Sequence, residues 1–211
     1  MKSEEPQWLP WARELQALAQ SGLAFTRDPY DRERYERLRE LSAEILAVHT
    51  TTSINRITEL FAGEVGYATP KVDVRAAVFD DHERLLMVRE TVDGGRWTLP
   101  GGWADVNVTP AENAVKEVRE ESGYSVHVTK LAAVWDRTRQ GHPSGVFSCC
   151  KIFFLCELTG GRPSTGLETS EVFWFAENEV PDALSLARVL PSQIARMFDH
   201  RRHPDLAADY D

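Results

Sequence analysis

The first third of the chain carries the hydrophobic spacing of helices. Between about residues 8 and 61, apolar side chains recur every three or four positions, which is the period of an amphipathic helix. Ser21-Gly22 predicts the end of a first helix, and Asp31 opens a second, longer one. A third helical segment is expected from about Ser53 to Phe61.

After Pro70 the period changes to the alternation that is typical of strands. Val72–Phe79 and Arg84–Glu90, separated by the turn at 80–83, predict a hairpin. Further strands are expected at 97–99, 124–136, 146–158 and 171–175, with helices at 110–122 and after Pro191.

This order of elements predicts two domains. Strands mixed with helices after an all-helical start are typical of a small helical domain joined to an α/β/α or α+β domain. A length of 211 residues allows one full-sized domain and a smaller one. We place the helical domain at residues 1–66, the α+β domain at 67–203 and a C-terminal tail at 204–211.

The predicted helix at 110–122 has well-defined ends. Thr109-Pro110-Ala111-Glu112 is a capping box with proline at the first helical position. Gly123 stands where a left-handed C-terminal cap is favoured. We therefore expect about three and a half turns of helix between these signals.

Three glutamates share one stripe of this helix. Glu117, Glu120 and Glu121 fall at i, i+3 and i+4. Like charges at this spacing repel one another, and acids near a helix C-terminus oppose its macrodipole. Such a cluster indicates a positive charge that the chain does not encode, most simply a divalent cation held by hard oxygen ligands. For the glutamates alone, an ordinary solvated helix face would be the better interpretation.

Two glycines upstream of this helix favour the metal site over the solvated helix face. Gly101-Gly102, within the run Trp97-Thr-Leu-Pro-Gly-Gly-Trp103, lets the backbone approach the acidic helix closely. The carbonyl group of Gly101 can then join the carboxylates around a metal ion. The paired glycines and the stripe of glutamates are therefore expected to lie side by side.

Residues Gly102–Tyr124 resemble the Nudix box of Nudix hydrolases. That pattern is a glycine, five residues, a glutamate, seven residues, and then Arg-Glu-aliphatic-x-Glu-Glu-x-Gly-aliphatic; here it ends in Lys116-Glu-Val-Arg-Glu-Glu-Ser-Gly123. The three metal-binding glutamates match position for position. Val108 and Lys116 replace the box glutamate and arginine, which brace the acidic helix in the family. A lysine lacks the planar fork of an arginine, so we expect these departures to affect the rate more than metal binding.

The resemblance implies an α+β chain in which a Nudix-like α/β/α sandwich with a mixed sheet follows the small all-helical domain. That helical part is similar to the accessory domain of bacterial Nudix hydrolases of the CDP-choline pyrophosphatase and ADP-ribose pyrophosphatase-like group. The implied reaction is metal-dependent hydrolysis of a nucleoside diphosphate linked to another moiety, with water attacking phosphorus. Mg²⁺ or Mn²⁺ would be held by Glu117, Glu120, Glu121 and the Gly101 carbonyl, unless a box glutamate such as Glu120 orients water instead.

Many relatives take a general base from a loop far downstream. The stretch Thr165-Gly-Leu-Glu168-Thr-Ser-Glu171 precedes a predicted strand, and a loop carboxylate at a strand edge can reach over a metal site. Glu168 is the first candidate and Glu171 the second. The alternative is that both are surface acids.

Substrate contacts are expected from cationic and aromatic side chains. These can meet phosphates, stack on a base or contact the leaving group, although for any single one a salt bridge or core packing is the commoner role. The candidates are Arg75, Arg89, Trp103, Arg137, His142 and Lys151.

Composition and charge limit the kinds of molecule that the protein is expected to bind. A net charge of -9 disfavours nucleic acids and anionic membranes, so a small nucleotide substrate is favoured over RNA. The three cysteines lie in one apolar run without CxxC spacing, which indicates core residues rather than zinc ligands. No apolar run approaches the roughly 18 residues of a membrane span. Since the start MKSEEPQWLPW lacks the features of a secretory signal, we expect a cytoplasmic protein.

Alternatives remain for both assembly and function. A helical domain of roughly 60 residues rarely buries its apolar faces alone, so we expect a homodimer, with a monomer and an intramolecular cap as the alternative. The other functions are an RNA-end or nucleoside triphosphate pyrophosphohydrolase, and a non-catalytic Nudix-fold ligand sensor. The retained glutamates argue against the sensor.

Overall fold

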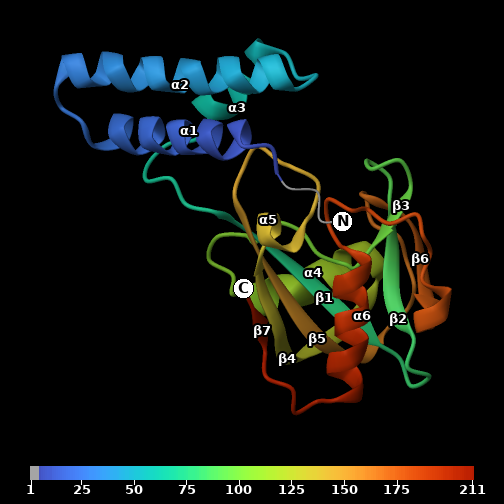
Figure 1. Ribbon diagram of the computed structural model, residues 1–211. Helices are drawn as coiled ribbons and strands as arrows, with labels where there is room; N and C mark the ends of the chain where they lie inside the picture. The colour runs from blue at the N-terminus through green and yellow to red at the C-terminus, as the bar shows by residue number, and fades with distance from the viewer. Residues whose placement is uncertain (1–4) are drawn as a thin grey trace. The chain divides into compact units, whose positions relative to one another are not determined.

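The computed structural model of the protein describes residues 5–211 (Figure 1). These residues divide into two compact units: the first extends to Pro70 and includes Ser144–Ser148, and the second contains Lys71–Pro143 and Cys149–Asp211. Each unit has a hydrophobic core of its own. Residues 1–4 of the helical domain predicted at 1–66 lie outside the described residues.

Three helices form the first unit, namely α1 (Trp8–Phe25), α2 (Pro29–His49) and α3 (Ile54–Ala62). The Asp28 carboxylate accepts hydrogen bonds from the first N–H groups of α2, and the Ser53 hydroxyl does the same for α3. Such caps satisfy amides that have no partner inside the helix. The core of this unit consists of Leu9, Ala12, Ala43, Leu46, Ile57 and Phe61, with Val146 packed against it.

The predicted end of the first helix at Ser21-Gly22 is wrong, because α1 continues to Phe25. Gly22 lies against the Tyr35 ring of α2, and a Cβ at this position would lie 2.4 Å from the ring carbons. The glycine therefore allows close packing of α1 on α2 instead of ending the helix. The second helix begins at Pro29 rather than Asp31, because proline is well tolerated in the first turn.

A mixed sheet forms the second unit. The strand order is β3-β2-β1-β5-β4-β7, and β6 pairs with β2. The β1–β5 and β4–β7 pairs are parallel, whereas the others are antiparallel, including the predicted β1–β2 hairpin. The strands are β1 (Lys71–Phe79), β2 (Leu85–Glu90), β3 (Arg96–Thr98), β4 (Tyr124–Asp136), β5 (Cys149–Gly161), β6 (Thr169–Phe175) and β7 (Asp209–Tyr210).

Helices cover both faces of the sheet, as Figure 1 shows. On one face, α4 (Pro110–Ser122) packs Ala114 and Val118 against alternate residues of β1. On the other face, α6 (Pro191–Arg202) packs Met197 and Phe198 against the intervening residues, such as Phe79. The predicted α/β/α sandwich with a mixed sheet is confirmed.

Both predicted ends of α4 are confirmed. Thr109 Oγ1 accepts a hydrogen bond from the Glu112 N–H at 3.2 Å, and Glu112 Oε2 accepts one from the Thr109 N–H at 3.0 Å. Gly123 has φ +73° and donates its N–H to the Arg119 carbonyl. The register of the glutamates on this helix is thus set by local signals at both ends.

Three short elements complete the second unit. Residues Arg137–Gln140 form α5, and Glu177–Glu179 form a single 3₁₀ turn. Strand β7 pairs with β4 through Ala133 and Asp209, so the segment predicted as a tail at 204–211 contributes to the sheet. Among the described helices, none is long and apolar enough to cross a membrane.

We expect Gly123→Ala to destabilise the second unit. A left-handed conformation costs an L-residue about 1–2 kcal/mol, and here a Cβ would also lie 2.4 Å from the Arg162 carbonyl oxygen. Gly141→Ala is the matched control, because Gly141 has φ +85° with nothing within 4 Å of such a Cβ. Urea unfolding should show the larger loss of stability for Gly123→Ala; equal losses would contradict the close packing at Gly123.

Candidate active site

The site begins with the loop after strand β3, which runs alongside strand β1. The N–H groups of Ala76 and Val74 donate to the carbonyls of Pro100 and Gly102 at 2.9 and 2.8 Å. Gly101 lies between these bonds with φ +145°, and a Cβ there would lie 2.0 Å from the Val74 carbonyl oxygen. Only glycine fits this position, so the two glycines bring the loop backbone against β1 as the sequence predicted.

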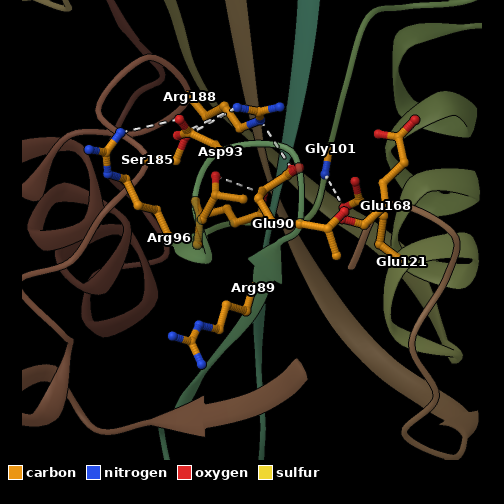
Figure 2. A network of polar contacts seen from close by, with 12 residues as sticks. Arg89, Glu90, Asp93, Arg96, Gly101, Glu121, Glu168, Ser185 and Arg188 are labelled. Carbon is orange, nitrogen blue, oxygen red and sulfur yellow. Dashed lines mark hydrogen bonds and ion pairs between the residues drawn. The ribbon is translucent and has the colours of Figure 1, made fainter. Parts of the chain in front are cut away.

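Glu121 of α4 is bound to this loop. Its carboxylate is buried and accepts a hydrogen bond from the Gly101 N–H at 2.9 Å, drawn as a dashed line in Figure 2. Burial raises the pKa of the Glu121 carboxyl to about 8, although the Arg75 charge and the Gly101 N–H oppose this shift. Repulsion from Glu117 and Glu90 raises that pKa further.

The other two predicted metal ligands differ from each other. Glu117 lies beside the loop, since a Cβ on Gly102 would lie 3.2 Å from its Oε1. Burial raises the pKa of the Glu117 carboxyl. The Glu120 side chain, by contrast, is 58% exposed. The structure thus brings two glutamates to the glycine loop and leaves the third in solvent.

Lys116 pairs with an acid that the sequence analysis did not select. Its Nζ lies 2.6 Å from Asp105 Oδ2 and 3.7 Å from Glu120 Oε2. The hydrogen bond that Lys116 donates to Asp105 raises the pKa of the lysine. Asp105 lies between the glycine loop and α4, so this pair connects the loop to the helix.

Glu90 is a site residue that sequence reasoning missed. It ends β2 and is 1% exposed, and its Oε1 lies 3.1 Å from Arg188 Nε. Its Oε2 is buried without a hydrogen-bond partner among the described residues. Burial raises the pKa of this carboxyl, and the charge of Glu168 adds to the shift. The only sequence signal was an acid at the end of a mostly apolar strand.

Figure 2 shows how Glu90 connects two groups of residues. On one side, Arg188 lies 3.7 Å from Asp93, and the Ser185 hydroxyl donates to the same Asp93 carboxylate at 2.6 Å. On the other side lie Glu121 and Glu168. The Arg188 network therefore fixes one oxygen of Glu90 and leaves the other without a partner.

The two candidate bases occupy different surroundings. The Glu168 carbonyl accepts hydrogen bonds from the N–H and the hydroxyl of Thr91, both at 2.9 Å. The charge of Glu168 adds to the effect of burial in raising the pKa of Glu90, and Figure 2 draws Glu168 on the same side of Glu90 as Glu121. Glu171 pairs instead with Arg89 at 2.5 Å, across the β2–β6 ladder. The structure therefore brings Glu168, and not Glu171, to the buried acids.

Two predicted phosphate contacts are buried. Arg75 Nη2 lies 2.7 Å from Asp73 Oδ2, and Lys151 Nζ lies 2.6 Å from Asp73 Oδ1. Arg75 also donates to the Leu99 carbonyl, just before the glycine loop. Burial lowers the pKa of Lys151 to about 8, against the effect of Asp73. Through the Leu99 carbonyl this cluster supports the start of the glycine loop, and it places the Arg75 charge near Glu121.

The remaining predicted substrate residues differ in their burial and in their surroundings. Trp103 is exposed and directly follows Gly102, whereas Arg137 begins α5. His142 is buried, with Nδ1 at 2.7 Å from the Leu186 carbonyl oxygen. Burial lowers the pKa of His142 to about 4, so its imidazole is neutral at physiological pH.

The residues at the glycine loop have the chemistry that suits a hard cation. They offer carboxylate oxygens whose charge is poorly compensated by the chain, and Glu90 Oε2 is an orphaned buried acceptor. Within residues 5–211, no three His, Cys, Asp or Glu side chains are already grouped to hold a metal ion. The donor types fit a divalent cation, while the exposed Glu120 stands outside the group.

Comparison with known proteins agrees with both units. The NUDIX domain family matches residues 69–196, and a family described as the UDP-X-like, N-terminal oligomerisation domain matches residues 6–61. A Bacillus subtilis (strain 168) protein named "Putative ADP-ribose pyrophosphatase YjhB" is 46% identical over 207 residues, which cover 98% of each chain.

Two solved structures are similar as well. The crystal structure of a UDP-X diphosphatase is 33% identical with a TM-score of 0.61, covering 97% of this chain and 98% of that one. An ADP-ribose pyrophosphatase from Streptococcus suis 89-1591 is 34% identical with a TM-score of 0.61, covering 68% of this chain and 100% of its own. With the family match over 69–196 and the box glutamates at the glycine loop, the chain belongs to the Nudix hydrolase family.

Proposed function

We propose that the protein is a divalent-metal-dependent pyrophosphohydrolase that cleaves a nucleoside diphosphate linked to another moiety. The observation that carries this proposal is the pair of glutamates, Glu117 and Glu121, at the Gly101-Gly102 loop. The similar proteins are named for ADP-ribose and UDP-X, which supports these two substrate types; the CDP-choline type that the sequence suggested belongs to the same chemical class. No described feature favours RNA ends or nucleoside triphosphates over them.

The metal would be held by the carboxylates of Glu117 and Glu121, with Glu120 and the Gly101 carbonyl as further ligands. When bound, Mg²⁺ or Mn²⁺ neutralises the diphosphate and acidifies a water molecule. The loop supports this role because the Gly101 N–H fixes one oxygen of Glu121 and leaves the other for a ligand. Arg75 and Lys151 act from behind the loop, through Asp73, rather than on phosphates.

Glu168 is the proposed general base. A general base must be able to reach the attacking water. The main chain of Glu168 is held beside the end of β2, which carries Glu90. Glu171 is less suited, because Arg89 already neutralises its carboxylate. Trp103 is the proposed contact for the base of the nucleotide, because its ring is exposed next to Gly102.

We further propose that the protein is a homodimer formed through α1. Trp11, Leu18 and Phe25 follow one another at seven-residue intervals and are 55%, 54% and 69% exposed. Apolar residues at this spacing form a stripe that suits packing against a second helix. The match of residues 6–61 to an oligomerisation domain supports a second copy of this chain as the partner.

Purified protein should release a nucleoside monophosphate from ADP-ribose or from a UDP-linked compound only when Mg²⁺ or Mn²⁺ is present. Glu121→Gln should lower the rate about 100-fold or more, since even supporting partners of metal ligands cost 10–100-fold. Glu36→Gln, on the exposed face of α2, is the control and should behave as wild type. Full turnover in excess chelator would overturn the metal assignment.

Lys116→Ala should slow turnover more than it weakens substrate binding, whereas Lys116→Arg should be tolerated. The reason is that Lys116 connects α4 to Asp105, so its loss loosens the helix that carries the ligands. Because the pair is exposed, unfolding free energy should change by less than about 1 kcal/mol. Asp105→Asn should reproduce the effect; a tenfold rise in KM with unchanged kcat would contradict this role.

Leu18→Glu should convert a dimer into a monomer, because it places a charge in the middle of the α1 stripe. Val48→Glu is the control, since Val48 is an apolar residue on α2 outside the stripe and, at 78%, is even more exposed than Leu18. Light scattering at micromolar concentrations measures the mass of each. A monomeric wild-type protein, or a dimer that survives Leu18→Glu, would rule out this interface.

A further inference from the structure

The loop between β5 and β6 is bound to the end of the helix that carries the glutamates. The Ser164 N–H donates to the Ser122 carbonyl at 2.9 Å, and Gly166 approaches the Glu120 carbonyl so closely that a Cβ would lie 2.3 Å from its oxygen. The last carbonyls of a helix have no partner inside it. The loop supplies partners for these carbonyls, so its position is fixed relative to α4.

Thr169 makes the central contact of this arrangement. Its side chain is buried, and its hydroxyl donates to the Glu121 carbonyl at 2.8 Å while accepting from the Gly166 N–H at 2.9 Å. One oxygen atom thus joins the helix to the loop. Valine has the same shape but can form neither bond, whereas serine can form both.

Thr91 holds the same segment from the opposite side. It directly follows Glu90, and both its N–H and its hydroxyl donate to the Glu168 carbonyl. Two threonines therefore hold Glu168: Thr91, at the end of the strand of Glu90, donates to its carbonyl, and the adjacent Thr169 donates to the carbonyl of Glu121. Apolar packing contributes little here, since the neighbouring Leu167 is fully exposed.

We propose that Thr169 and Thr91 are positioning residues, whose hydroxyl groups hold Glu168 at a fixed place relative to Glu90 and Glu121. This inference rests on the proposed function, in which Glu168 accepts a proton from water. The threonines touch neither substrate nor metal; they act through the peptide of Glu168. Without these hydroxyl groups the loop retains its sequence, its charge and the bond from the Thr91 N–H to the Glu168 carbonyl, but it is held less firmly at its distance from the acids.

The test compares Thr169→Val, Thr169→Ser and Thr91→Val in the full-length protein. Thr129→Val is the control, because the Thr129 hydroxyl also donates to a main-chain carbonyl, that of Leu155, away from this loop. With a substrate that the wild type hydrolyses, Thr169→Val should lower kcat about tenfold with little change in KM, as expected for an outer partner of a site. Thr91→Val should act in the same direction, and Thr169→Ser and Thr129→Val should stay near wild type.

Hydrogen exchange gives a readout that needs no activity. Thr169→Val should expose the amides of residues 164–169 to faster exchange, and Thr169→Ser should keep them protected. Unchanged exchange in Thr169→Val would overturn the inference, and so would faster exchange with an unchanged kcat. If the wild type hydrolyses no compound tested, the proposed function fails, while the exchange rates still support or overturn the attachment of the loop through Thr169.

Discussion

The chemistry of the second unit depends on the close approach of the Pro100–Gly102 backbone to strand β1. A Cβ at Gly101 would lie 2.0 Å from the Val74 carbonyl oxygen, so the approach exists only because residue 101 is glycine. That approach turns the Gly101 N–H toward α4, where Glu121 accepts its hydrogen bond. One steric constraint thus sets the distance between the loop and the acidic helix.

Burial of the acids at this loop makes the ionised form of each carboxyl unfavourable. Glu121, Glu117 and Glu90 lose much of their hydration, which raises the pKa of each carboxyl. The cations near these carboxyls are already engaged by other acids: Arg75 by Asp73, Lys116 by Asp105, and Arg188 by Asp93 as well as by Glu90. The chain therefore leaves negative charge with insufficient compensation at one place, which is the arrangement that a bound divalent cation relieves.

Local sequence signals made the acidic helix predictable from the sequence. The capping box at Thr109 and the glycine at 123 fixed the register of α4, and with it the stripe of glutamates. Contacts between distant segments were not readable in the same way. The burial of Arg75 and Lys151 follows from the parallel β1–β5 register, which places Lys151 opposite Asp73. Asp105 and Thr169 become site residues only through such pairings, because no local pattern marks them, and Glu90 is marked only by its place at the end of a strand.

Thermal unfolding at increasing Mg²⁺ or Mn²⁺ concentration tests the central claim most directly, that Glu117 and Glu121 leave a charge that a cation must balance. A ligand that binds only the folded state raises its stability with the logarithm of the ligand concentration. We predict that Tm of the wild type rises with the divalent cation and that Glu117→Gln flattens this rise. A wild-type Tm that is independent of both cations would contradict the account.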